Sequence, residues 1–138
     1  MTMTSLADRR ILVTGSAGFI GFHAAQRLLD AGAQVLGIDN FTPYYDVSLK
    51  EARTAILNAQ PGFRLARLGI EEADALGAVW REFAPDTVIH LAAQAGVRYS
   101  IDHPDAYVAT NVTGTFNLLE LARHHPVRHF LAASASSV

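Results

Sequence analysis

The 138-residue sequence contains no cysteine and a single lysine, and its net charge at neutral pH is only −2. The absence of cysteine excludes disulfides and thiolate metal sites. The sequence has no excess of lysine and arginine over acidic residues, which a protein needs to bind the phosphate backbone of nucleic acids. No apolar run approaches the roughly 20 residues of a membrane helix, since Gly15, Gly18 and Gly21 interrupt the uncharged stretch 11–26. We therefore expect a cytoplasmic protein that binds neither nucleic acid nor membrane.

The sequence also gives little support to metal or serine-nucleophile chemistry. Of the six histidines, His124 and His125 are adjacent and His90 lies inside a strand-like run, with no cysteine to accompany them. The segment "SASS" lacks the Gly-x-Ser-x-Gly pattern of a nucleophile elbow. We expect no metal site and no catalytic serine.

Short β-prone runs alternate along the chain with longer stretches of helical spacing. The acidic residues at the start of the third helical stretch suit the dipole of that helix. Strand and helix in strict alternation require parallel pairing through right-handed crossovers. The sequence therefore predicts one α/β domain over 1–138, a Rossmann-like doubly wound parallel sheet of about five strands that is truncated after the fifth. The predicted strands are Ile11–Thr14, Gln34–Ile38, Phe63–Leu68, Thr87–His90 and His129–Ala132, and the predicted helices are Phe19–Ala31, Val47–Asn58, Glu71–Phe83 and Pro104–His124.

The best-supported helix is the last of these. Val108, Val112, Phe116 and Leu119 are separated by four, four and three residues, which places them on one helical face. Pro104 suits the first turn, because a proline there loses no helical hydrogen bond.

The stretch "ILVTGSAGFIG" places three glycines between the first predicted strand and the first predicted helix. Gly15 permits a sharp bend, Gly18 lets the backbone lie against a diphosphate, and Gly21 lets the helix pack close to the sheet. The N–H groups around Gly18, Phe19 and Ile20 would then point at the phosphates. Glycine spacing alone is equally compatible with an ordinary loop.

The residue that strengthens the dinucleotide interpretation is Asp39, at the end of the second predicted strand. It follows Gly21 by eighteen residues, close to the offset of about 20 at which a carboxylate meets the adenosine ribose. No arginine lies within 40–45 to bind a 2′-phosphate, so the sequence predicts NAD rather than NADP. The alternative is that Asp39 only forms a turn before Asn40.

Several separate motifs occur in an order that resembles a known family. "VTGSAGFIG", "GIDNF", "VIHLAAQAGVRYS" and "NVTGTFNLLELAR" are similar to the extended short-chain dehydrogenase/reductase family of NAD-dependent epimerases and dehydratases. Within that family, "DNFTPYYDVSLKEAR" and "AGVRYSIDHPDAYVATNVTGT" most resemble the N-terminal NAD-binding portion of CapI-like UDP-glucuronate 4-epimerases. The resemblance runs from about Ile11 to Val138.

The resemblance implies a set of site residues. Phe19 and Ile20 would lie over the pyrophosphate, Asp39 would bind the adenosine ribose, and Asn111 would lie beside the nicotinamide. Arg98 is a candidate contact for a substrate phosphate or carboxylate, although a solvated loop arginine is as common. The full cofactor-binding set is Gly15, Gly18, Phe19, Ile20, Gly21, Asp39, Asn40, Gly69, Ile70, Leu91, Ala92, Ala93 and Asn111.

The sequence departs from the family pattern at positions that bear on catalysis. The family uses a Tyr-x-x-x-Lys pair to remove the proton of the sugar 4-hydroxyl, but the only lysine here is Lys50 and Asp46 stands four residues before it. Ala135 occupies the place of the Ser or Thr that assists the tyrosine; Ser136 is a neighbouring substitute. We therefore assign no catalytic residue.

One departure concerns the cofactor. Gly69 stands where the family places an aspartate that hydrogen-bonds the adenine amine, so NAD binding is expected to weaken by about 1 kcal/mol.

Two functions follow from these observations. The first is the NAD-binding portion of a nucleotide-sugar epimerase or dehydratase, inactive as given and able to act on a nucleotide sugar only when the missing half is supplied. The second is a non-catalytic dinucleotide-binding module, or a decayed or truncated gene product. An uncovered fifth strand would also favour self-association.

Overall fold

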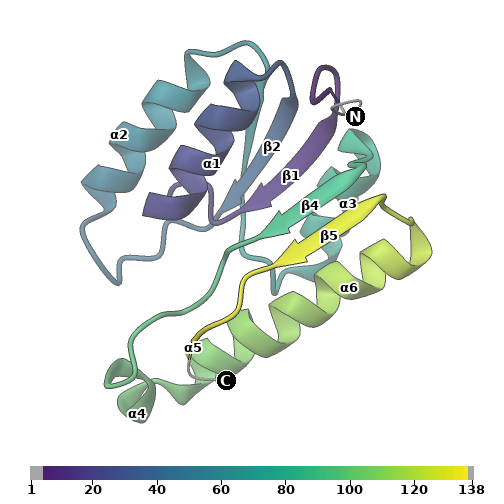
Figure 1. The fold of residues 1–138 in the computed structure, drawn as a ribbon. Helices are drawn as coiled ribbons and strands as arrows, with labels where there is room; N and C mark the ends of the chain where they lie inside the picture. The colour runs from purple at the N-terminus through teal and green to yellow at the C-terminus, as the bar shows by residue number, and fades with distance from the viewer. Residues whose placement is uncertain (1–4, 137–138) are drawn as a thin grey trace.

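A computed structural model describes residues 5–136 and has a five-stranded parallel sheet at its centre (Figure 1). The spatial order of the strands is β3-β2-β1-β4-β5, so the winding direction reverses between β1 and β4. The predicted Rossmann-like fold is confirmed. The strands are β1 (Arg10–Thr14), β2 (Gln34–Asp39), β3 (Phe63–Arg67), β4 (Thr87–His90) and β5 (His129–Ala132).

Helices cover the two faces of the sheet (Figure 1). On one face lie α1 (Phe19–Asp30) and α2 (Val47–Asn58), and on the other lie α3 (Ala73–Phe83) and α6 (Thr115–His124). Each covered face has its own apolar core, because successive strand residues point to opposite sides. Val13 and Val35 pack with α1, whereas Leu12 and Leu36 pack with Trp80 of α3 and Leu118 of α6.

The long helix predicted over Pro104–His124 is not one regular α-helix. It consists of α5 (Pro104–Tyr107), a π-helical segment η1 (Val108–Gly114) and α6. A separate short helix, α4 (Tyr99–Asp102), precedes it and was not predicted. π-Helical turns are frequently found at functional sites, and η1 carries Asn111, which bonds to Gln94 in the loop after β4.

The third helix also differs from its prediction. It begins at Ala73 with Glu72 as its N-cap, so Glu71 precedes the helix and does not belong to its first turn. The other element boundaries agree with the prediction to within one residue.

No helix within residues 5–136 is long and apolar enough to cross a membrane.

The apolar face that identified the last helix does not face the core. Val112 is 63% exposed and Phe116 is 59% exposed, and Val108 and Leu119 are also more than half exposed. The buried side of this helix instead presents Leu118. The periodicity therefore predicted a helical segment here, but not the face that packs. A different row of side chains, which includes Leu118, packs against the sheet.

We expect this exposed apolar face, together with the edge strand β5, to make the chain self-associate. β5 pairs with β4 alone among the described residues, and contiguous apolar surface favours association. Replacing Val112→Asp and Phe116→Asp together should shift the chain toward monomer in sedimentation velocity at high protein concentration. Ile56→Asp serves as the control, because Ile56 is 50% exposed on α2, outside this face. Monodisperse monomer for the unsubstituted chain would contradict the expectation.

Candidate cofactor-binding site

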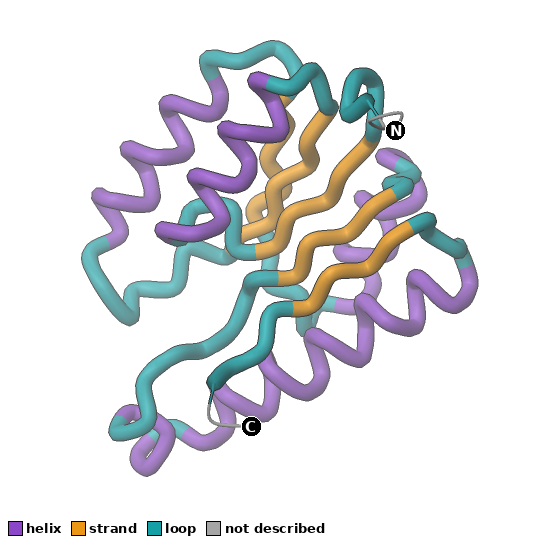
Figure 2. The backbone as a smooth tube through the Cα atoms, viewed as in Figure 1, coloured by secondary structure: helices purple, strands orange, loops and turns teal. Residues whose placement is uncertain are grey.

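The loops that follow β1, β2, β3 and β4 leave the sheet at its carboxyl end (Figure 2). Residues from the ends of these strands and from these loops line one pocket. This is the position at which doubly wound sheets bind ligands, where the strand order reverses. The residues that line the pocket are Gly15, Gly18, Ile38, Asp39, Asn40, Thr42, Tyr44, Tyr45, Lys50, Leu68, Gly69, Ile70, Glu71, Leu91, Ala92, Ala93, Gln94, Ala95 and Thr110.

The turn between β1 and α1 is shaped by its glycines. Gly15 has φ +74°, and a Cβ at this position would lie 3.1 Å from the Ala92 backbone nitrogen. A Cβ on Gly21 would overlap the Gly15 carbonyl, so Gly21 permits the start of α1 to pack on the turn itself. Both positions therefore require glycine for steric reasons.

The N–H groups of this turn differ from the expectation at one position. The Gly18 N–H donates to the Gly15 carbonyl oxygen at 3.0 Å, so it is not free to bind a phosphate. The first residues of α1, Phe19 and Ile20, have no intrahelical acceptor for their N–H groups, and no other acceptor is recorded for them among the described residues. The anion-binding donors are thus at the helix start rather than at Gly18.

Asp39 is buried at the end of β2 and holds the turn in place. Its Oδ2 accepts a hydrogen bond from Ala17 N at 3.0 Å, and its Oδ1 accepts one from Phe41 N at 2.8 Å. Phe41 has φ +55°, a conformation that the bond from its N–H helps to maintain. A carboxylate has about four lone-pair positions, so Asp39 can form this turn and still accept hydroxyl groups of a ribose.

Lys50 supplies a cation that the sequence analysis did not place in the site. Its Nζ lies 3.7 Å from Asp39 Oδ1 and 4.9 Å from the centroid of the Tyr45 ring. The side chains of Lys50 and Asp39 are both more than 90% buried. The distance of 3.7 Å makes this contact an ion pair rather than a hydrogen bond. The only lysine of the sequence therefore lines the pocket. No spacing in the sequence predicted this position for it.

Small residues after β4 form the opposite end of the pocket. Leu91, Ala92 and Ala93 line it as predicted, and Thr110 of η1 lies near them. Asn111 is not among the lining residues. Its Oδ1 accepts from Gln94 N at 2.8 Å, and its Nδ2 donates to the Gln94 carbonyl oxygen at 3.3 Å. Asn111 therefore holds the loop after β4 in position.

The segment after β3 closes the pocket beyond Asp39. Gly69 N donates to Glu72 Oε2 at 2.6 Å, and the Ile70 carbonyl accepts from Asn117 Nδ2 at 3.0 Å. These bonds fix the backbone that carries Gly69 and Ile70 along the pocket wall. Glu71 follows them and also lines the pocket.

A buried histidine connects β1, β4 and α6 beneath the pocket. Thr14 Oγ1 accepts from the N–H groups of Leu91 and Ala92, each at 3.0 Å, and lies 2.7 Å from His90 Nδ1. Both hydroxyl lone pairs are thus occupied, so Thr14 donates its proton to Nδ1. Nε2–H then donates to Thr115 Oγ1 at 2.9 Å. This network requires a neutral imidazole, and burial lowers the pKa of His90.

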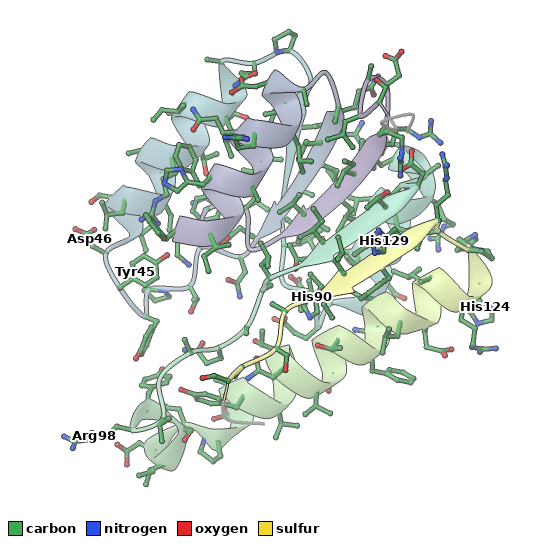
Figure 3. All side chains as sticks on the ribbon, in the orientation of Figure 1. Tyr45, Asp46, His90, Arg98, His124 and His129 are labelled. Atoms are coloured by element: carbon green, nitrogen blue, oxygen red, sulfur yellow. The ribbon has the colours of Figure 1, made fainter. Side chains whose placement is uncertain are left out.

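Some of the predicted site residues lie outside the pocket wall. Phe19 and Ile20 are about two-thirds exposed at the start of α1, and Gly21 packs beneath the turn. Arg98 is exposed at the tip of the loop after β4 and points away from the sheet (Figure 3). The remaining nine predicted cofactor residues line the pocket.

Ala135 and Ser136 lie in an exposed loop, because β5 ends at Ala132. Neither residue lines the pocket.

The described residues contain no group of three His, Asp or Glu side chains placed to hold a metal ion. His90 lies at the carboxyl end of β4, whereas His124 and His129 lie toward the other end of the molecule (Figure 3).

The sequence is similar to a known family and to several named proteins. A sequence model of the GDP-mannose 4,6 dehydratase family matches residues 12–138. The chain is 51% identical over 129 residues to a Rhizobium meliloti protein named "Probable UDP-glucuronate 4-epimerase" and 43% identical over 129 residues to protein CapI of Staphylococcus aureus. Both matches cover 94% of this chain, and the chain spans 38% of the length of each relative.

The fold is also similar to solved structures. The UDP-glucuronic acid 4-epimerase of Bacillus cereus, in complex with UDP-glucuronic acid and NAD, superposes with a TM-score of 0.85 at 38% identity. That match covers 94% of this chain and 41% of the other chain.

The neutral state of His90 predicts a pH dependence of folding. The pKa of His90 is lowered from 6.5 in the folded chain, so the unfolded chain takes up this proton first as the pH falls. The stabilisation is complete above about pH 6.5 and is lost below it, with a slope of up to about 1.4 kcal/mol per pH unit. In urea unfolding between pH 7.5 and 5, His90→Gln should show a shallower decline of the free energy of unfolding than the unsubstituted chain.

The control for this experiment is His129→Gln, which changes an exposed histidine. It should retain the steeper decline of the unsubstituted chain. Equal slopes for the unsubstituted chain and for His90→Gln would show that this network does not depend on a neutral imidazole.

Proposed function

Because the chain belongs to the GDP-mannose 4,6-dehydratase family, we propose that it is the NAD-binding portion of a nucleotide-sugar epimerase or dehydratase. UDP-glucuronate is the proposed sugar nucleotide, and 4-epimerisation is the proposed reaction. The names of the relatives and the ligands of the B. cereus structure support this choice. The chain matches the N-terminal part of these proteins, so activity on a sugar is proposed for the whole protein and not for these residues alone.

The observation that carries the proposal is the order of groups along the carboxyl end of the sheet. The free N–H groups at the start of α1 suit a diphosphate, and the Asp39 carboxylate at the end of the neighbouring strand β2 suits the hydroxyls of a ribose. On the other side of β1, Ala92 and Ala93 after β4 leave room for a flat ring. Adenosine, diphosphate and nicotinamide would follow one another across the sheet in this order. NAD supplies the hydride acceptor that such a reaction requires.

The pocket also affects the choice between NAD and NADP. Asp39 would repel a 2′-phosphate, but Lys50 lies 3.7 Å from the same carboxylate and partly offsets its charge. The prediction of NAD from the lack of an arginine within 40–45 did not include this lysine, which lies outside that segment. We still propose NAD, with a preference over NADP that is set by the balance between these two side chains.

These residues alone are not expected to catalyse the reaction. Lys50 is the only lysine of the chain, and its ammonium group lies against Asp39 and the Tyr45 ring in the cofactor pocket. It is therefore unable to serve as the lysine of a Tyr-x-x-x-Lys pair. Turnover of a nucleotide sugar would need a tyrosine–lysine pair from outside these residues.

We expect isothermal titration calorimetry to detect saturable binding of NAD⁺ and weaker binding of NADP⁺. Asp39→Asn should lower NAD⁺ affinity by about tenfold or more, because hydrogen bonds to a charged group contribute about 1.5–3 kcal/mol. The amide retains the side-chain volume but offers one acceptor oxygen in place of two, so the bond from Ala17 N or from Phe41 N is lost as well. Circular dichroism of the variant verifies that it is folded.

Asp86→Asn is the matched control for this titration. Asp86 accepts bonds from Arg9 and from Arg10 N at the amino ends of β1 and β4, opposite the pocket. The Asp86→Asn substitution should lower the free energy of unfolding but leave the NAD⁺ affinity unchanged. Absence of NAD⁺ binding to the folded, unsubstituted chain would overturn the proposed function.

A further inference from the structure

The side chain of Glu71 fills a space that Gly69 leaves empty. A Cβ built on Gly69 would lie 2.6 Å from Glu71 Cδ, much closer than real atoms approach. The carboxylate of Glu71 therefore lies where the side chain of any larger residue at 69 would begin. Both residues line the cofactor pocket after the end of β3.

This carboxylate has no hydrogen-bond donor within the described residues. Glu71 Oε2 is buried without a hydrogen-bond partner among the described residues. The N–H of Gly69 is occupied by the neighbouring Glu72 at 2.6 Å. A buried acceptor without a partner is costly and rare in folded proteins. A carboxylate in a pocket wall therefore suggests a ligand that brings a donor.

The order of the strands indicates which part of a dinucleotide reaches Glu71. The diphosphate lies at β1 and the ribose at Asp39 of β2 in the proposed function, and β3 is the next strand on that side. The base attached to that ribose would then lie against Leu68, Gly69 and Ile70. The base of NAD is adenine, which carries one exocyclic amine as a hydrogen-bond donor.

We propose that Glu71 is the residue that recognises the adenine amine, and this inference rests on the proposed function. The carboxylate accepts the amine hydrogen bond and rejects a base that has a carbonyl oxygen at the same position. Gly69 then does not weaken NAD binding by itself. Because it has no side chain, it leaves space for the longer side chain of Glu71, two residues later in the sequence. The expected loss of NAD affinity at Gly69 is offset by this contact.

The first test compares NAD⁺ with nicotinamide hypoxanthine dinucleotide, in which a carbonyl oxygen replaces the adenine amine. The unsubstituted chain should bind NAD⁺ at least about tenfold more tightly in calorimetry, since a charged acceptor discriminates strongly between a donor and an acceptor. Glu71→Gln should bring the two affinities to within about threefold of each other, because its amide can donate as well as accept. Asp74→Asn removes an exposed carboxylate of the adjacent helix and should retain the full preference.

The second test moves the carboxylate back to position 69. Gly69→Asp alone should weaken NAD⁺ binding, because its carboxylate repels that of Glu71 and moves the Glu71 side chain from its place beside Gly69. Gly69→Asp combined with Glu71→Ala should restore the affinity, since Gly69 lies outside the left-handed region and accepts a side chain once the space is free. Circular dichroism of each variant verifies folding.

The outcomes separate this inference from the proposed function. NAD⁺ binding with an unchanged preference in Glu71→Gln overturns the role of Glu71 and leaves the cofactor assignment intact. Absence of binding of either dinucleotide to the unsubstituted chain overturns both. Recovery in the double variant together with loss of preference in Glu71→Gln supports the role of Glu71.

Discussion

The carboxylate of Asp39 joins three segments at the carboxyl end of the sheet, and the geometry of the pocket depends on it. It accepts the N–H of Ala17 in the β1–α1 turn and the N–H of Phe41 in its own loop, and it lies beside the ammonium group of Lys50 from α2. A buried charge is tolerated only when it is paired and hydrogen-bonded. The same contacts that satisfy Asp39 therefore fix the distance between the phosphate-binding turn and the proposed ribose position.

A second buried network sets the position of the other half of the pocket. The Thr14 hydroxyl at the end of β1 accepts from two backbone N–H groups after β4, and the His90 ring extends this network to α6. Ala92 is thereby held against Gly15, where a Cβ would meet its backbone nitrogen at 3.1 Å. The two networks leave little freedom for the loops after β1, β2 and β4, which agrees with a rigid, largely preformed cofactor site.

The sequence predicted the sheet, its helices and nine of the residues that line the pocket, and it did so from patterns that are local in the chain. It did not predict Lys50 or Glu71 as pocket residues. Lys50 lies eleven residues after Asp39, and its approach depends on how α2 packs. Glu71 was interpreted as part of a helical first turn, but the helix begins later and the side chain turns toward Gly69. Gly18 was expected to offer its N–H to a phosphate, yet the turn uses that donor itself.

Local sequence thus determined the elements and the glycine turn. The spacing of apolar residues, the positive φ of Gly15 and the contact between Gly21 and the Gly15 carbonyl all act on the backbone within a few residues. Tertiary structure decided which face of the last helix is buried. Val112 and Phe116 have the spacing of a core stripe, but the sheet is covered by Leu118 and its neighbours. Tertiary structure also decided which charged residues line the pocket together. Asp39, Lys50 and Glu71 come from different segments, and they lie near one another only once the sheet has formed.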